Sequence, residues 1–174
     1  MDFIGYTCYY QAIRSRKESL FLKNVCTFFG HHDCPSSVAP KLREVLTDLI
    51  ENKSVDCFYV GNKGAFDRLV RSVLRELVRD YPHIRYAVVL DRLPGRQEED
   101  LSDTLLPEGI ESVPPRFAIA WRNKWMLRRS DYVVTYITHP WGGAAQFAET
   151  AVRQGKTVIR LAGNDRFPDN MDRL

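Results

Sequence analysis

Five short apolar runs recur along the chain, and their spacing most strongly limits what it can fold into. The runs cover residues 25–29, 55–60, 84–90, 131–138 and 157–161 and are rich in β-branched and aromatic residues. They mostly lack strict alternation of apolar and polar residues, which is typical of strands that are covered on both faces. The pattern therefore predicts five buried strands.

Stretches with helical periodicity separate most of these runs. They cover residues 38–51, 66–81, 116–130 and 143–154, and Gly155 stands at a helix-stop position after the last one. Alternating strands and helices predict an α/β fold, a Rossmann-like three-layer domain with a mostly parallel sheet of about five core strands.

Two regions do not follow this alternation. Residues 1–24 precede the first strand and are predicted to form an N-terminal extension, so that the domain itself covers residues 25–174. Residues 91–115 are polar and rich in proline and glycine, and at about 25 residues they are longer than an ordinary loop. We expect a functional lid or a mobile segment there.

The composition limits the class of protein. With 174 residues and 44% hydrophobic content, the chain can build one core of ordinary size. No apolar run approaches the roughly 20 residues that span a bilayer, and the N-terminus lacks the pattern of a secretion signal. We therefore expect a cytoplasmic protein without a membrane partner. The net charge of +3 makes nucleic acid a possible partner but not a favoured one.

The cysteines and histidines do not predict a metal site. The four cysteines form no CxxC pair, and we expect them to be reduced. His31 and His32 are adjacent in an extended segment, so their side chains point in opposite directions and do not easily bind one ion. We expect no metal and no cofactor.

Glycine turns follow three of the predicted strands. Ligands of open α/β sheets bind beyond the carboxyl ends of the strands, so three such turns at one edge favour a pocket for phosphate or ribose. The alternative is that each glycine only permits a tight turn from strand to helix. The residues that we expect at the ligand site are Gly30, His31, Gly61, Asn62, Gly64, Asp67, Trp141, Gly142 and Gly143.

Four motifs occur in a fixed order along the chain. They are FFGHxDCP at 28–35, YVGNxGxFD at 59–67, SDYVV at 130–134 and GGAA at 142–145. Together they resemble the YpsA-like small bacterial proteins of the SLOG superfamily, named for the Smf/DprA DNA-processing proteins and the Lonely Guy enzymes. The resemblance covers about residues 25–162. The superfamily includes hydrolases, nucleotide sensors and DNA-binding proteins. The resemblance therefore implies a nucleotide-like ligand but does not single out one activity.

The Lonely Guy phosphoribohydrolases, which cleave the N-glycosidic bond of nucleoside monophosphates, offer a chemical comparison. Their PGGxGTxxE motif is matched by Gly142, Gly143 and Glu149, and their RKxxM stretch by Arg122 and Met126. The resemblance implies that Arg122 would hold the phosphate or ribose of the substrate. It also implies that Glu149 would stabilise the developing oxocarbenium ion or activate water.

The chain departs from that motif at three positions. Trp141, Ala145 and Gln146 replace the proline, the later glycine and the threonine of the enzymes. Three functions follow from the sequence. The first is binding of a nucleotide or nucleotide-derived small molecule at the carboxyl-terminal rim of the sheet. The alternatives are a phosphoribohydrolase and a non-catalytic adaptor in DNA processing or cell division.

The tryptophans have different expected roles. Trp121 and Trp125 are four residues apart on one helix, and we expect them to pack in the core. Trp141 lies at the last glycine turn, and one hypothesis is that its ring stacks on a base of the ligand. Exposed tryptophan and leucine on the helices would make a homodimer possible.

Overall fold

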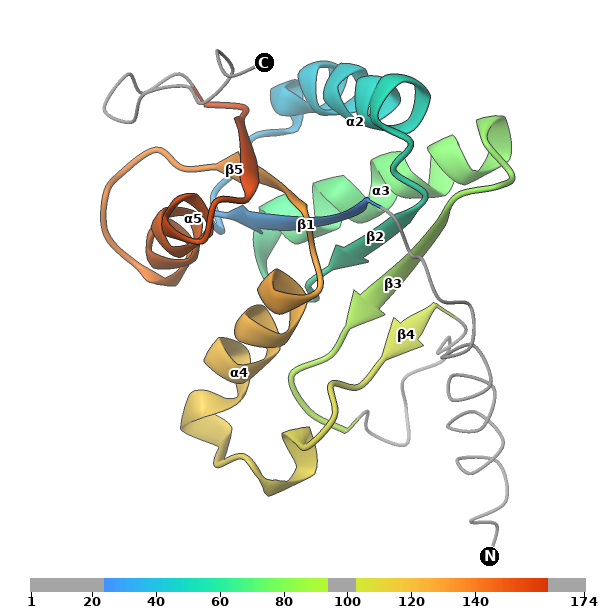
Figure 1. Ribbon diagram of the computed structural model, residues 1–174. Helices are drawn as coiled ribbons and strands as arrows, with labels where there is room; N and C mark the ends of the chain where they lie inside the picture. Colours follow the sequence, from blue (N-terminus) through green and yellow to red (C-terminus); the bar gives the residue numbers. More distant parts are fainter. Residues whose placement is uncertain (1–23, 94–102, 163–174) are drawn as a thin grey trace, which may run out of the picture.

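The computed structural model describes residues 24–93 and 103–162, so the predicted N-terminal extension lies almost entirely outside the described residues. The strands are β1 (Val25–Gly30), β2 (Cys57–Val60), β3 (Arg85–Val89), β4 (Thr104–Leu105), β5 (Tyr132–Tyr136) and β6 (Thr157–Arg160). They form one sheet in the order β4-β3-β2-β1-β5-β6, and every neighbouring pair is parallel (Figure 1).

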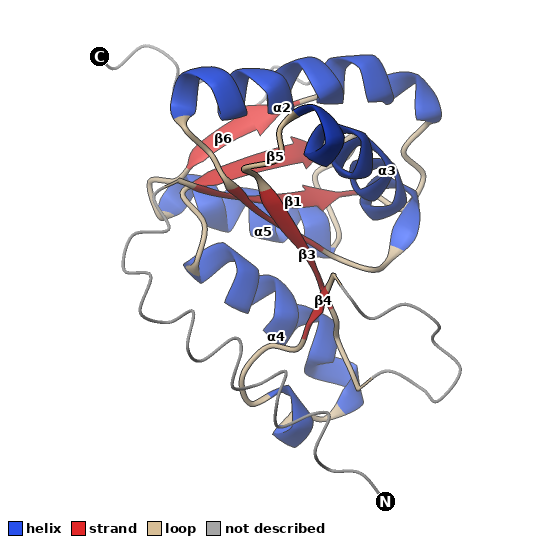
Figure 2. Ribbon diagram, turned by 90° about the vertical axis from the view of Figure 1, so that its right-hand side faces the viewer, coloured by secondary structure: helices blue, strands red, loops and turns tan. Residues whose placement is uncertain are grey.

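Helices cover both faces of this sheet. The elements are the short 3-10 helix η2 (Ser36–Val38), α2 (Ala39–Lys53), α3 (Gly64–Asp80), the 3-10 helix η3 (Ile110–Ser112), α4 (Pro115–Arg128) and α5 (Gly143–Arg153). Helices α2 and α3 lie on one face, whereas α4 and α5 lie on the other (Figure 2). The predicted three-layer α/β fold is therefore confirmed.

The core has one apolar cluster on each face of the sheet. Phe28 packs in the cluster under α2 and α3, and the next residue, Phe29, packs in the cluster under α4 and α5. Successive residues of a strand point to opposite faces, and both are apolar because both faces are covered. This burial explains why the apolar runs lack alternation.

The described part of the segment 91–115 contains regular structure that was not predicted, while its role as a lid or a mobile segment stays a prediction. Residues Thr104 and Leu105 pair with Val88 and Val89 and add β4 as a sixth strand at the edge of the sheet. The 3-10 helix η3 follows it and leads into α4. A strand of two residues is too short to show a hydrophobic period, and residues 94–102 lie outside the described part of the chain.

The order of the strands reverses at the middle of the sheet. From β1 the chain proceeds through β2 to β4 on one side, and β5 and β6 lie on the other side of β1. Loops that leave neighbouring strands toward opposite faces open a crevice at their carboxyl ends, where ligands of such folds bind. The topology therefore predicts a ligand crevice between the loops that follow β1 and β5. No helix in the described part of the chain is both long and apolar enough to span a membrane.

Candidate ligand site at the carboxyl ends of the strands

The glycine that ends β1 makes room for an aromatic ring. A Cβ atom added at Gly30 would lie 2.2 Å from Cδ1 of Phe66, far inside van der Waals contact. Phe66 belongs to the first turn of α3, and its side chain is only 1% exposed. Packing thus accounts for Gly30 without a ligand.

The glycines after β2 are also enclosed by protein atoms. A Cβ atom at Gly61 would lie 2.3 Å from Oδ2 of Asp67, and one at Gly64 would lie 3.1 Å from Cα of His32. Gly64 has a φ of +90°, which disfavours any residue with a side chain. The second turn is therefore close-packed and leaves no hollow at its glycines.

Arg122 forms the centre of a buried polar cluster beside this turn. Its Nη1 donates a hydrogen bond of 2.6 Å to Oδ1 of Asn62, and its Nε and Nη2 both donate to Oδ1 of Asn123, at 3.2 and 3.0 Å. Only 4% of Arg122 is exposed, and burial lowers the pKa of its guanidinium while Asp67 and Asp91 raise it. Arg122 is thus held by protein groups on several sides.

Two buried carboxylates complete this cluster. Oδ2 of Asp67 accepts a hydrogen bond of 2.9 Å from the backbone N–H of Lys63. Burial raises the pKa of Asp67 to about 6, although Arg122 and the Lys63 N–H lower it. Asp91, at 4% exposure, lies 3.8 Å from Nζ of Lys63. Asp91 was not predicted from the sequence, although it directly follows the third apolar run, just as other rim residues follow their runs.

A stack of three rings joins the loops that follow β1 and β5. The rings of His31 and His139 are 3.6 Å apart at 10°, and those of His139 and Trp141 are 4.3 Å apart at 20°. The backbone N–H of Thr138 donates to Nδ1 of His31 at 3.1 Å, which places the proton of the neutral ring on Nε2. The described segments contain no cluster of three His, Cys, Asp or Glu that would bind a metal ion.

His31 has an incompletely satisfied ring. The residue is 5% exposed, and its Nε2 has no hydrogen-bond partner of normal geometry among the described residues. Burial lowers the pKa of His31, and the neighbouring His139 lowers it further. The backbone carbonyl of Trp141 lies near the ring and raises its pKa. Trp141, at the other end of the stack, is 67% exposed.

The glycine pair at the start of α5 differs from the other glycines. A Cβ atom at either Gly142 or Gly143 would meet nothing within 4 Å. Gly142 has a φ of +93°, so its backbone favours glycine, whereas Gly143 has an ordinary helical position. Neither packing nor backbone conformation explains glycine at position 143, which leaves the first turn of α5 open to an approaching group.

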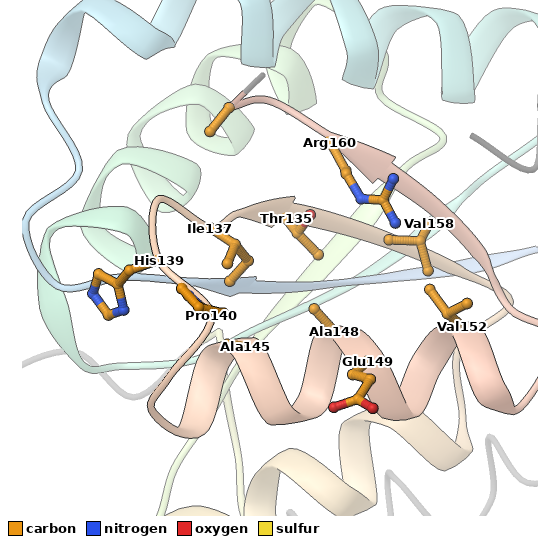
Figure 3. A pocket seen from close by; sticks show the side chains of 11 residues that line it. Thr135, Ile137, His139, Pro140, Ala145, Ala148, Glu149, Val152, Val158 and Arg160 are labelled. Carbon is orange, nitrogen blue, oxygen red and sulfur yellow. The ribbon is translucent and has the colours of Figure 1, made fainter. Parts of the chain in front are cut away.

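Glu149 lines a pocket that the ring stack reaches only through His139 (Figure 3). The pocket lies between α5 and strands β5 and β6, and its lining includes His139, Ala148, Val158 and Arg160 but not Arg122. The carboxylate of Glu149 is exposed and lies 3.7 Å from Nη2 of Arg153. Two residues earlier, Phe147 packs against Phe29 in the core, and positions two apart on a helix point in nearly opposite directions.

The structure thus divides the sequence-predicted residues into three groups. Arg122 lies with Gly61, Asn62 and Asp67, while Gly30 and Gly64 are fixed by packing. A second group joins His31 to Trp141 through His139, directly before Gly142 and Gly143. Glu149 lines the pocket beyond His139.

Comparisons with known proteins add a similarity of fold. No family model matches the chain, and no curated protein matches it. The structure is similar to the X-ray structure of DNA processing protein A (DprA) from Streptococcus pneumoniae, with a TM-score of 0.59 and 14% sequence identity. The match covers 82% of this chain and 52% of that chain, so this chain spans about half the length of the similar protein. At this identity the similarity concerns the fold alone and indicates no particular activity.

Proposed function

We propose that the chain binds a nucleotide or a nucleotide-derived small molecule in the crevice between β1 and β5. Gly143 carries the proposal, because it keeps the first turn of α5 open although no packing or backbone strain requires glycine there. The backbone N–H groups of a helix start attract phosphate. Within the SLOG superfamily, the four ordered motifs favour a YpsA-like member.

The ring stack supplies further contacts for such a ligand. Trp141 lies directly before the glycine pair and exposes 67% of its surface, so a base can stack on its free face. Nε2 of His31 carries a hydrogen-bond donor without a regular partner, and His139 lies between the two rings. A phosphate and a base would therefore meet complementary groups in the loop before α5, and His31 would add a donor from the loop after β1.

Ligand binding is tested first on the wild-type chain. Mass spectrometry of the purified protein identifies any small molecule that copurifies with it. A thermal-shift panel then includes nucleoside monophosphates, ADP-ribose and cyclic dinucleotides, and we expect at least one of them to raise the melting temperature. A panel without any stabilising compound, together with the absence of a copurified nucleotide, would remove the support for this function.

Gly143→Ala tests the site itself. The added methyl group enters open space, so we expect the free energy of unfolding to stay the same or to rise by up to about 1 kcal/mol. The affinity should fall at least about tenfold, or about 1.4 kcal/mol. Thr150→Ala on the same helix is the matched control and should bind like the wild type. Equal affinity of Gly143→Ala and the wild type would place the ligand elsewhere.

The phosphoribohydrolase alternative has less support from the geometry. Arg122 is enclosed by Asn62 and Asn123, and Glu149 lines a pocket that does not include Arg122. Incubation with nucleoside monophosphates tests this alternative directly. Release of free base by the wild type, and its loss in Glu149→Gln, would establish the hydrolase.

The second candidate function is a non-catalytic adaptor in DNA processing or cell division. The similarity of fold to DprA, whose name describes DNA processing, favours this role. An adaptor needs a contact surface, and α4 exposes large apolar side chains. Salt-sensitive retention of DNA, or binding of another protein, without stabilisation by any small nucleotide would favour the adaptor over the nucleotide-binding function.

A further inference from the structure

The outward side of α4 exposes aromatic and basic side chains together. Phe117, Trp121, Lys124 and Arg128 follow one another at spacings of four, three and four residues, which places them on one side of the helix. Phe117 is 51% exposed and Trp121 is 40% exposed, so the prediction that Trp121 packs in the core was wrong. We call this outward side, with its neighbours Arg116 and Arg129, the α4 surface.

A groove runs along part of the α4 surface. Its lining consists of Glu108, Trp121, Lys124, Trp125, Arg128 and Arg129. Nε1 of Trp121 donates a hydrogen bond of 3.3 Å to the carbonyl of Glu108, which fixes the indole at the edge of the groove. Trp125 packs edge-on against Tyr59, with ring centroids 5.2 Å apart. The aromatic walls of the groove are thus held in place by the fold.

The α4 surface carries positive charge that the described residues do not neutralise. None of Arg116, Lys124, Arg128 and Arg129 forms an ion pair with another described residue. By contrast, Arg43 on the opposite face of the sheet pairs with two carboxylates. The groove has three cations and one carboxylate in its lining, so an occupant with negative charge is electrostatically complementary to it.

The contacts on this surface favour a partner protein over single-stranded nucleic acid or a second copy of the chain. The guanidinium of Arg129 lies 4.1 Å from the ring of Trp125, and that of Arg116 lies 4.7 Å from the ring of Phe117. Bases of a single strand would have to displace these cations to stack on those faces. A second copy of the chain would bring the same positive charges together. Exposed tryptophan beside arginine is also typical of the centres of protein interfaces.

We propose that the α4 surface binds an acidic peptide segment of a partner protein. An apolar side chain of the segment would contact Trp121, and its carboxylates would pair with Lys124 and Arg128. The inference rests on the adaptor function above and not on the small-ligand site, since the α4 surface shares no residue with the loop around Gly143.

Selection from a phage-displayed library of random peptides on the full chain tests this proposal. We expect the selected peptides to be rich in Asp and Glu and to contain a large apolar residue. Their affinity should fall at least tenfold for Trp121→Ala and for the double variant Lys124→Glu/Arg128→Glu. Arg79→Glu, an exposed charge reversal on α3, is the matched control and should bind like the wild type.

Several results would overturn the proposal. One such result is selection of peptides that are neutral or basic. Another is binding of the selected peptides to the charge-reversed variant as tightly as to the wild type. Tighter binding of a labelled oligothymidine, lost in the same variants, would assign the surface to nucleic acid. A wild-type dimer that Trp121→Ala dissociates in sedimentation would assign it to a second copy. Thermal melting checks that each variant is folded, and nucleotide binding measured on the same variants separates this failure from that of the ligand site.

Discussion

Gly30 ends β1 and Gly143 begins α5, and their surroundings differ completely. The ring of Phe66 fills the space beside Gly30, whereas the space beside Gly143 is open. A sequence shows the missing side chain in both cases but not which atoms occupy its place. The contact partner of Gly30 lies 36 positions along the chain, on another element, so local patterns carry no information about it.

At Gly30 we expect a steric cost. Gly30→Ala forces the added methyl group against Phe66 and should lower the free energy of unfolding by about 1–3 kcal/mol, the usual cost of overpacking a core. Urea denaturation measures the loss. In a Phe66→Leu background, where the ring is absent, the same substitution should cost less. An equal cost in both backgrounds would contradict the steric explanation.

Asp67 should make stability depend on pH in the acidic range. Burial raises its pKa to about 6 in the folded chain, so the folded state binds this proton more tightly than the unfolded state does. The contribution is therefore fully present below about pH 4 and is lost as the pH rises through about 6. As the pH rises from about 4 through about 6, the free energy of unfolding of the wild type should therefore fall by roughly 1–3 kcal/mol more than that of Asp67→Asn.

Denaturation in urea at a series of pH values measures this difference. The exposed Asp48→Asn serves as the control, because it removes a carboxylate without touching the cluster around Arg122. Parallel stability curves for Asp67→Asn and the wild type would show that Asp67 keeps its proton equally well in the unfolded chain, and burial would then not govern its titration.

At the scale of elements, apolar contact should hold α2 and α3 together more strongly than charge does. Arg43 of α2 pairs with Glu76 and Asp80 of α3, both at 2.7 Å, but all three side chains are well exposed to solvent. Exposed ion pairs contribute about 0–1 kcal/mol, whereas truncation of a buried leucine costs about 2–5 kcal/mol. We expect Leu46→Ala, at a fully buried position of α2, to be much more destabilising than Arg43→Ala.

Salt separates the two effects in the same denaturation experiment. The small cost of Arg43→Ala should shrink further in about 1 M salt, where exposed charges are screened within about 3 Å. The cost of Leu46→Ala should persist there, because the hydrophobic contribution is not screened. A larger loss for Arg43→Ala than for Leu46→Ala would mean that charge dominates the contact between the helices.

Long elements were predictable from the sequence, and short or exposed ones were not. The five apolar runs became β1, β2, β3, β5 and β6. Strands β1, β2 and β5 are apolar over most of their length because helices cover both of their faces. The edge strand β4 was missed, since its two residues carry no period. Trp121 was assigned to the core from its spacing of four with Trp125, but α4 turns position 121 outward.

The candidate site was predictable to the same degree. The rim of the sheet follows from the order of strands and helices. At this rim the ring stack joins His31 to Trp141, which directly precedes the glycine pair. The separation of Arg122 from the pocket of Glu149 was not predictable, because it depends on which flank of each helix faces the sheet. Phe147 determines this orientation for α5 through its contact with Phe29.

At the scale of the whole molecule, the order of the strands implies a gradient of local stability. Strands β1, β2, β3 and β5 each have a neighbour on both sides, whereas β4 and β6 form the edges of the sheet. Edge strands also have fewer buried side chains, since every residue of β6 is at least partly exposed. Local opening should therefore require less free energy at the edges than at the centre.

Hydrogen exchange measured by NMR tests this gradient. We expect the amides of β1 and β5 to exchange only through global unfolding and those of β6 to exchange faster, because β6 can separate from β5 while the centre stays intact. A stabilising nucleotide should slow exchange at residues 138–145 more than in β6, since the proposed contacts lie in that loop. Equal protection of β6 and β1 would instead mean that the sheet opens as one cooperative unit.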